Sequence, residues 1–280
     1  MIASGQQGEL DSAVAEIHPT SVVDKHADLA DDVRVGPNCV IEGKVVLGAG
    51  TRLIAGVYLN GPITCGAGNT FYPFCCIGFA PQHLGFDPAE DGSGVLIGAG
   101  NCFREGVTIT RAMGQSPTTI GDHNYMMANT HAGHDAVMAD HCVLGNGALL
   151  GGYVTLGDRV VLGGIAGIHQ FCRAGRLAML SGGAGITKDL PPFCTSYMTR
   201  TVGSLNLVGL RRAGYRDHVK PLQHAFDILY RQGRTNTTAV DMIEKELGDD
   251  PLCSELAQFV RGSKRGITSY ARSRDAAAEQ

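Results

Sequence analysis

The sequence is poor in the residues that usually build a core of large side chains. It contains no tryptophan, and aromatic residues make up only 6% of its 280 residues. Hydrophobic residues nevertheless account for 44% of the chain, and glycine occurs 39 times. This composition argues against an ordinary core and for a backbone that turns tightly and often. The length fits one large domain, or one domain with a smaller appendage.

Long apolar runs and a basic leader are also missing. No segment approaches the roughly 18 apolar residues of a membrane-spanning helix, and the stretch MIASGQQGELDSAVAE has no basic segment followed by an apolar one. We therefore expect a cytoplasmic protein without membrane insertion. The net charge of −4 disfavours nucleic acid as a partner.

Apolar residues recur at every sixth position in three runs. The runs extend from Ile17 to Ile77, from Ile97 to Ile109 and from Ile120 to Ile186. A small or β-branched residue usually follows four positions later. Six residues are too few for a pair of helices but suit a short strand and a turn, so the repeat predicts stacked coils of a parallel β-helix.

The repeat also accounts for most of the nine cysteines, among which no C-x-x-C pair occurs. Cys65 falls on the main apolar position, and four others fall on the position for small residues: Cys39, Cys75, Cys142 and Cys172. The chain is too long to be a small secreted disulfide scaffold. These cysteines are predicted to be compact core residues, and no metal site is expected.

Two stretches break the six-residue register, near residues 78–96 and 110–119, and must project from the coils as loops. Long ordered loops on a rigid scaffold often carry function. After DLPP at 189–192 the apolar spacing becomes helical, with helices expected around Val219 to Tyr230 and in TTAVDMIEKELG and PLCSELAQFVRG. The predicted organisation is an N-terminal extension (1–16), a β-helix (17–190) and a helical C-terminal domain (191–280).

The segment NTHAGHD places His131 and His134 three residues apart, with Asp135 directly after the second. A lone outward histidine is most often a solvated bystander, so position by itself leaves both a structural and a catalytic interpretation open. An imidazole that titrates near neutrality is nevertheless suited to general-base chemistry.

Longer motifs resemble known families. The pattern in IGDHNY and LGNGAL resembles the hexapeptide acyltransferases, which implies a left-handed triangular prism with three hexapeptides per coil. NTHAGHD and IHQFCRAG, together with FREGVTITR, DLPPF, NLVGLRRAGY and AFDILYRQG, resemble in order and spacing the acyl carrier protein-dependent UDP-N-acetylglucosamine O-acyltransferases of lipid A synthesis. This resemblance implies a homotrimer with acyl carrier protein and UDP-N-acetylglucosamine as partners, and no cofactor beyond the thioester donor.

The resemblance also implies roles for individual residues. His134 is the expected general base, Asp135 its orienting acid and Gly152 the backbone donor of an oxyanion hole. Adjacent side chains diverge in a regular strand, so the geometry of Asp135 stays open. Gly182 is the expected ruler of acyl-chain length, predicting a donor of roughly 12 to 14 carbons because glycine leaves room for more methylenes. Expected substrate contacts are His131, His169, Gln170, Asn206, Arg212, His83 and Tyr153.

Several positions depart from the family pattern. QHLG, with His83 and Gly85, stands where the family has QDLK, and Tyr153 stands where it has a third histidine. Three further departures are Thr110 for a histidine, Val208 for an acid and Ala213 for an arginine. Each lost polar contact typically costs about 1 to 3 kcal/mol. UDP-N-acetylglucosamine is the leading acceptor, while another nucleotide-linked amino sugar and a degenerate non-catalytic paralogue are the alternatives.

The segment from Arg200 to Arg234 carries seven basic and two acidic residues. Arg212, Arg216 and Lys220 recur every four residues and on a helix would form one basic face. Such a face is either simply solvated or attracts the acidic acyl carrier protein. A zinc enzyme resembling the γ-class carbonic anhydrases, with His123, His131 and His134 as ligands, is a less favoured alternative.

Overall fold

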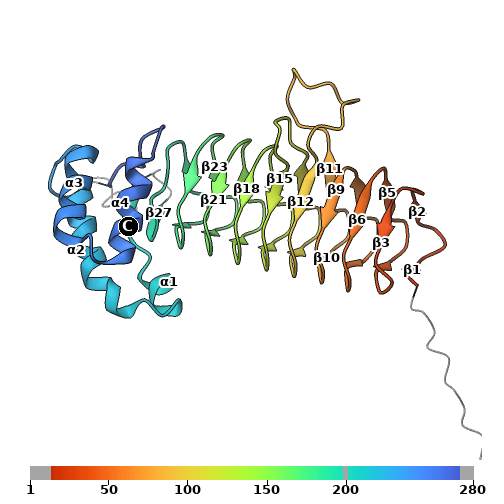
Figure 1. Ribbon diagram of the computed structural model, residues 1–280, viewed down its shortest axis with the longest axis horizontal. Helices are drawn as coiled ribbons and strands as arrows, with labels where there is room; N and C mark the ends of the chain where they lie inside the picture. Colours follow the sequence, from red (N-terminus) through yellow and green to blue (C-terminus); the bar gives the residue numbers. More distant parts are fainter. Residues whose placement is uncertain (1–13, 198–200, 272–280) are drawn as a thin grey trace, which may run out of the picture.

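The computed structural model describes residues 14–197 and 201–271, and consists of a three-sided prism of short strands with helices gathered at one end (Figure 1). The predicted extension at 1–16 lies mostly outside the described residues. The predicted fold class, a left-handed parallel β-helix followed by helices, is confirmed. No helix among the described residues is long and apolar enough to cross a membrane.

Three sheets form the sides of the prism. Sheet A contains β1 (Glu16–Ile17), β4 (Arg34–Val35), β7 (Arg52–Leu53), β10 (Thr70–Phe71), β13 (Cys102–Phe103), β16 (Tyr125–Met126), β19 (Val143–Leu144), β22 (Val161–Leu162), β25 (Met179–Leu180), β27 (Cys194–Tyr197) and β28 (Thr201–Leu205). Sheet B contains β2 (Val22–Val23), β5 (Val40–Glu42), β8 (Tyr58–Asn60), β11 (Cys76–Phe79), β14 (Thr108–Thr110), β17 (His131–Ala132), β20 (Leu149–Leu150), β23 (Gly167–Ile168) and β26 (Gly185–Ile186). Sheet C contains β3 (Asp28–Leu29), β6 (Val45–Leu47), β9 (Ile63–Cys65), β12 (Val95–Ile97), β15 (Thr118–Ile120), β18 (Val137–Met138), β21 (Thr155–Leu156) and β24 (Arg173–Ala174).

Each coil stacks directly on the next with parallel pairing, and among the described strands only β28 pairs antiparallel, with β27, at the end of sheet A. Val22 pairs with Val40, 18 positions further on, so a regular coil takes three six-residue units. The main apolar position of each unit faces the prism axis and is buried from Val35 onward, whereas Ile17 at the open N-terminal end is 42% exposed. The five cysteines predicted as core residues are buried and free. Burial raises the pKa of the Cys65 thiol to about 12, so it stays protonated.

The corners of the prism are tight turns that place one residue in the left-handed region. Glycine and asparagine adopt this conformation at low cost, but Ile165, Tyr153 and Phe171 also do so, with φ between 59° and 64°. One corner, which joins sheet B to sheet C and is called corner B below, carries Asp135, Tyr153 and Phe171 on successive coils.

Both interruptions of the repeat are loops, as predicted. The longer one leaves the prism between β11 and β12, and the side chain of Arg111 binds its backbone. Arg111 is 5% exposed, and its guanidinium donates to the carbonyls of Pro88 and Glu90 and to Asn60 Oδ1 at 2.7 to 3.1 Å. The shorter loop, residues 111–117, connects β14 in sheet B to β15 in sheet C of the same coil, at corner B.

The helical end begins later than the sequence predicts. Sheet A continues past residue 190 through β27 and β28, and the helices are α1 (Leu207–Arg212), η1 (Arg216–His218), α2 (Val219–Tyr230), α3 (Asn236–Leu247) and α4 (Pro251–Arg261). The expectation of one basic helical face is wrong. Gly214, with φ at 87°, separates α1 from η1, so Arg212, Arg216 and Lys220 belong to three different elements.

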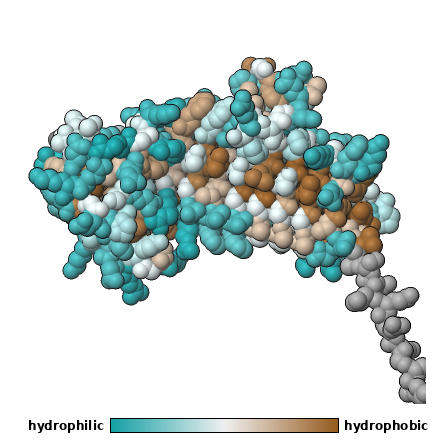
Figure 2. All heavy atoms as spheres, in the orientation of Figure 1, coloured by the Kyte–Doolittle hydropathy of each residue, from teal (hydrophilic) through white to brown (hydrophobic). Residues whose placement is uncertain are grey.

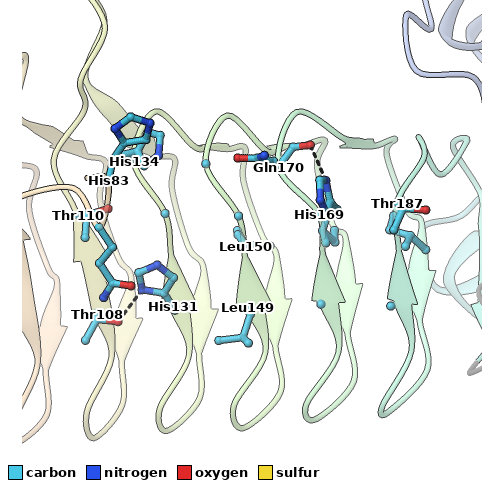
Figure 3. Close-up of a pocket in the computed structure, with 18 of the residues that line it drawn as sticks. His83, Thr108, Thr110, His131, His134, Leu149, Leu150, His169, Gln170 and Thr187 are labelled. Atoms are coloured by element: carbon cyan, nitrogen blue, oxygen red, sulfur yellow. Dashed lines mark hydrogen bonds between the residues drawn. The ribbon is translucent and has the colours of Figure 1, made fainter. Parts of the chain in front are cut away.

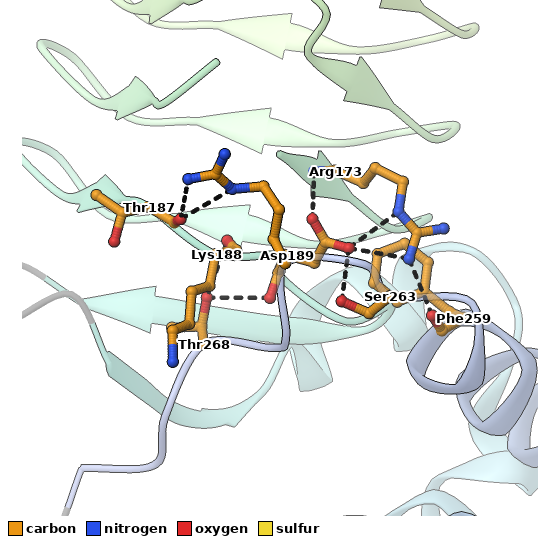
Figure 4. Close-up of polar contacts among 8 residues, drawn as sticks. Arg173, Thr187, Lys188, Asp189, Phe259, Ser263 and Thr268 are labelled. Atoms are coloured by element: carbon orange, nitrogen blue, oxygen red, sulfur yellow. Dashed lines mark hydrogen bonds and ion pairs between the residues drawn. The ribbon is translucent and has the colours of Figure 1, made fainter. Parts of the chain in front are cut away.

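A buried carboxylate joins the last coils to the helical end (Figure 4). Asp189 is 2% exposed and accepts hydrogen bonds from Arg173 Nε at 3.0 Å and Ser263 Oγ at 2.9 Å. Arg173 also lies over the ring of Phe259 in α4 and donates to its carbonyl. Because the charge of Asp189 is paired and its oxygens are occupied, this contact fixes the helices to the prism.

Glycines that follow the inward residue set the distance between coils. An added Cβ at Gly145 would lie 2.6 Å from Gly164 N of the next coil, whereas one at Gly167 would meet nothing within 4 Å. We expect Gly145→Ala to lower the free energy of unfolding by about 1 to 3 kcal/mol through overpacking. Gly167→Ala is the matched control and should melt like the unaltered protein. Equal melting temperatures for the two variants would contradict the close stacking.

Candidate active site

A cavity of about 880 Å³ lies on the outer face of sheet B, beside corner B (Figure 3). Outward side chains of sheet B form its floor, corner B forms one edge, and the longer loop overhangs it with Gln82 and His83. Its lining includes Thr108, Thr110, His131, His134, Leu149, Gly152, His169, Gln170 and Thr187. The cavity thus gathers four histidines, from the longer loop and from two coils.

His134 and Asp135 form a close pair at the edge of this cavity. His134 Nδ1 lies 2.8 Å from Asp135 Oδ2, and the two side chains are 12% and 7% exposed. Adjacent side chains diverge in a strand, but Asp135 lies in the corner with φ at 59°, which turns its carboxylate back toward the preceding residue. Because a carboxylate only accepts, Nδ1 carries the proton and Nε2 is left as the basic nitrogen.

The shorter projecting loop holds the carboxylate of Asp135 in place. Gly114 N–H donates to Oδ1 at 2.8 Å and Met113 N–H donates to Oδ2 at 3.1 Å. The Asp135 N–H in turn donates to Thr118 Oγ1 at 2.8 Å. These charge-assisted bonds fix the orientation of the acid, and through it that of the imidazole. The sequence predicts the loop but contains no signal for this contact, which joins residues more than 20 positions apart.

Gly152 lies directly under the ring of His134. An added Cβ at this glycine would come within 2.6 Å of the imidazole Cε1 and Nε2 atoms, so only glycine fits there. Among the described residues, no acceptor is found for Gly152 N–H. Gly152 thus lies against the imidazole and has a backbone N–H without a described acceptor, which makes this N–H a candidate donor to an oxyanion formed next to the base.

The other cavity histidines have defined partners. His131 Nδ1 lies 2.8 Å from Thr108 Oγ1, and burial, followed by the neighbouring His134, lowers the pKa of His131 and favours its neutral form. His169 Nδ1 lies 3.2 Å from the Gln170 carbonyl. His83 Nδ1 accepts from Gly85 N–H at 3.1 Å, and its ring lies edge-on to His134 with centroids 6.0 Å apart.

Of the predicted substrate contacts and the predicted chain-length ruler, four residues do not line this cavity. Tyr153 packs against the ring of His134 instead, and Gly182 lies at a different corner beside Gly164. Asn206 caps α1, accepting from Gly209 N–H and donating to the Leu177 carbonyl. Arg212 lies exposed at the end of α1.

Thr110, at one of the departures from the family, lines the cavity with its Oγ1 buried and without a hydrogen-bond partner among the described residues.

His123 lies at another corner, stacked on His141 with centroids 5.2 Å apart, so it does not meet His131 and His134 within one chain. In the part of the chain that the structure describes, no group of three or more histidine, cysteine, aspartate or glutamate side chains has the arrangement of a metal site.

Comparison with known proteins identifies the relatives of this chain. Residues 189–268 match the family model described as UDP N-acetylglucosamine O-acyltransferase, domain 2. The acyl-[acyl-carrier-protein]–UDP-N-acetylglucosamine O-acyltransferase of Halorhodospira halophila is 38% identical over 91% of this chain and 99% of its own length. That of Thermodesulfovibrio yellowstonii is 39% identical over 90% of this chain and 98% of its own length.

Solved structures identify the same relatives. The structure of LpxA from Acinetobacter baumannii is 33% identical and superimposes with a TM-score of 0.87, covering 90% of this chain and 99% of its own. The UDP-N-acetylglucosamine acyltransferase of Francisella novicida is 30% identical with a TM-score of 0.88, covering 92% and 96%. The shared identity extends along nearly the whole chain, through both the prism and the helices. The chain therefore belongs to the acyl-[acyl-carrier-protein]–UDP-N-acetylglucosamine O-acyltransferase family.

Proposed function

We propose that this protein transfers an acyl group from the thioester of acyl carrier protein to the 3-hydroxyl of UDP-N-acetylglucosamine, the first step of lipid A synthesis. The observation that carries the proposal is the His134–Asp135 pair, set over Gly152 at the edge of an open cavity. The pair supplies a base with one free nitrogen, and the glycine supplies a donor next to it. Membership of the family supports both substrates.

The reaction needs one general base and one hydrogen-bond donor that stabilises the oxyanion. His134 Nε2 takes the proton of the sugar hydroxyl as its oxygen attacks the thioester carbonyl carbon. The carbonyl oxygen becomes an oxyanion that Gly152 N–H stabilises, while Asp135 stabilises the imidazolium. Collapse of the tetrahedral intermediate breaks the C–S bond, and the departing thiolate takes the proton from His134. The products are the sugar ester and the free thiol of the carrier, with no covalent enzyme intermediate.

The polar groups of the cavity are placed to bind the acceptor. His131 is held by Thr108, while His169 and Gln170 line the cavity from another coil and His83 lines it from the longer loop. A neutral His131 can both donate and accept a hydrogen bond, which suits sugar hydroxyls. Asn206 and Arg212 lie outside this cavity within one chain, so a contact with a sugar nucleotide bound in the cavity would require a neighbouring subunit.

A different nucleotide-linked amino sugar is the second candidate acceptor, because His83 and Thr110 give the cavity a changed set of polar contacts. Mass spectrometry of the products from a panel of UDP-sugars and acyl carrier protein thioesters distinguishes the two acceptors. No transfer to any sugar in the panel would support the degenerate, non-catalytic alternative.

Exposed basic residues lie in the segment that we propose binds the acyl donor, acyl carrier protein. Arg212, Arg216 and Lys220 are all exposed, although they belong to three short elements and not to one helix. Long-range attraction depends on the local excess of positive charge and not on a regular helical face. We therefore retain this segment as the docking surface for the acidic carrier protein. A cytoplasmic location stays a prediction.

We expect a homotrimer. The cavity has a floor and one edge but stays open on the remaining side, and apolar residues gather on the face of the prism (Figure 2). On sheet B, Val22, Tyr58 and Leu149 are 62%, 40% and 50% exposed, which is unusual unless a second surface covers them. Threefold packing of prisms would close three equivalent sites. Sedimentation equilibrium should give three times the chain mass, and an active monomer would contradict this arrangement.

Replacing the base should abolish turnover. We expect His134→Ala to lower kcat by about 10² to 10⁴, because a general base contributes on that order. The melting temperature should change little, since the imidazole lies at the edge of the cavity and not on the prism axis. His141→Ala removes a histidine from another corner and should retain full activity. If His134→Ala kept more than half of the turnover, another base would have to be found.

Gly182 remains the proposed ruler of chain length. An added side chain there has space, because the nearest atom to a new Cβ is the Gly164 carbonyl oxygen at 3.5 Å. Donors of roughly 14 carbons should be favoured over those of 10 by up to about a hundredfold, at about 0.8 kcal/mol per methylene. Gly182→Met should reverse this order, and Gly182→Ala is the size control. Unchanged selectivity in the methionine variant would place the ruler elsewhere.

A further inference from the structure

Tyr153 is placed differently from the substrate contact that the sequence predicts. It lies on corner B, one coil beyond Asp135, and does not line the cavity. Its backbone adopts φ at 59°, a conformation that costs a bulky residue roughly 1 kcal/mol. A bulky aromatic residue held in this conformation at the edge of a catalytic site calls for a compensating contact.

The compensating contacts are with two rings. Tyr153 meets His134 edge-on, with centroids 5.2 Å apart and planes at 90°. Its other side stacks on Phe171 from the next coil, at 4.8 Å and 10°. Both separations lie in the favourable range for aromatic pairs. Phe171 occupies the same corner position one coil further on, in the left-handed conformation that His123 and Ile165 also adopt at other corners, so the regular corner geometry stacks the two rings into one aromatic wall beside the base.

The surroundings of His134 are otherwise polar. Asp135 contacts Nδ1, His131 lies on the adjoining strand and His83 overhangs from the longer loop. Burial, with a smaller contribution from Asp135, raises the pKa of Tyr153 and keeps its hydroxyl protonated. Tyr153 is therefore an uncharged neighbour of the base, and it adds no competing charge to the pair.

We propose that Tyr153 is a positioning residue for the general base, its ring, backed by Phe171, forming a wall that holds the imidazole of His134 over Gly152. Without this wall the imidazole would gain rotameric freedom and its Asp135 side would open to water. A small displacement of Nε2 from the sugar hydroxyl would slow proton transfer without loosening the sugar. The proposal rests on the proposed role of His134.

Steady-state kinetics of Tyr153→Ala and Tyr153→Phe test this role. We expect Tyr153→Ala to lower kcat by about 10- to 100-fold, on the order of what misplacement of a catalytic group costs. The KM and directly measured Kd for UDP-N-acetylglucosamine should stay within about twofold. Tyr153→Phe retains the ring and should keep kcat within about threefold. A raised KM with unchanged kcat would show that Tyr153 binds substrate, and would overturn the proposal.

Phe171 provides a second test that does not depend on the stability of Tyr153→Ala. It is 51% exposed, so Phe171→Ala should fold normally. We expect it to lower kcat by about 3- to 10-fold alone and to have no further effect in Tyr153→Ala, because coupled residues are non-additive. Additive effects, or a full-activity Phe171→Ala, would overturn the proposal.

The matched control is His141→Ala, which removes one ring of a stacked pair from the same backbone conformation at another corner. It should leave kcat unchanged. The two proposals fail in different ways. If the unaltered protein transfers no acyl group, the proposed function fails. If it transfers and only His134→Ala is inactive, while the Tyr153 variants match His141→Ala, the positioning role fails alone.

Discussion

The structure depends on one constraint, the direct stacking of each coil on the next through parallel backbone hydrogen bonds. Residue Glu16 pairs with Arg34 and Arg34 with Arg52, so residues 18 apart lie in columns along the prism. The side chains of one column all lie in the same environment, either on the prism axis or on the outer surface. Inward columns take apolar side chains because the prism axis excludes water, whereas outward columns are free to carry chemistry.

The active site follows from this arrangement of columns. Thr108 and His131 are successive members of one outward column of sheet B, and they bond to each other because coils lie only one strand spacing apart. Corner B is a second such column, which brings Asp135 and Tyr153 to the same histidine. A rigid prism holds these groups without any movement of the scaffold, which is what a preorganised base and oxyanion donor require.

The interruptions of the repeat add what the columns cannot supply. The shorter loop delivers two backbone N–H groups to Asp135, and the longer loop carries His83 over the cavity. Arg111 connects the two loops, since it lies in the shorter one and binds carbonyls of the longer one. At the other end, the buried Asp189 holds the helices to the last coils. The interruptions and the cap therefore complete and anchor a site whose base and floor belong to the regular repeat.

The sequence by itself determined the fold and the candidates for chemistry. A six-residue apolar period admits few structures, and it predicted the inward residues, both loops, the buried cysteines and the helices around Val219 to Tyr230. It did not predict that sheet A continues to Leu205 or that Gly214 splits the basic segment, because both depend on packing at the end of the prism. Local spacing cannot report such contacts.

Only the tertiary structure decided how the site is assembled. Whether Asp135 meets His134 depends on the left-handed backbone of a corner and on N–H groups more than 20 residues earlier in the chain. The sequence indicates Tyr153 as a substrate contact, and the stacking of coils adds a contact that the sequence does not predict, between the ring of Tyr153 and that of His134. The physical reason is the same in each case. A sequence pattern fixes which column a residue occupies, while the direction of a corner side chain is set by the coils above and below it.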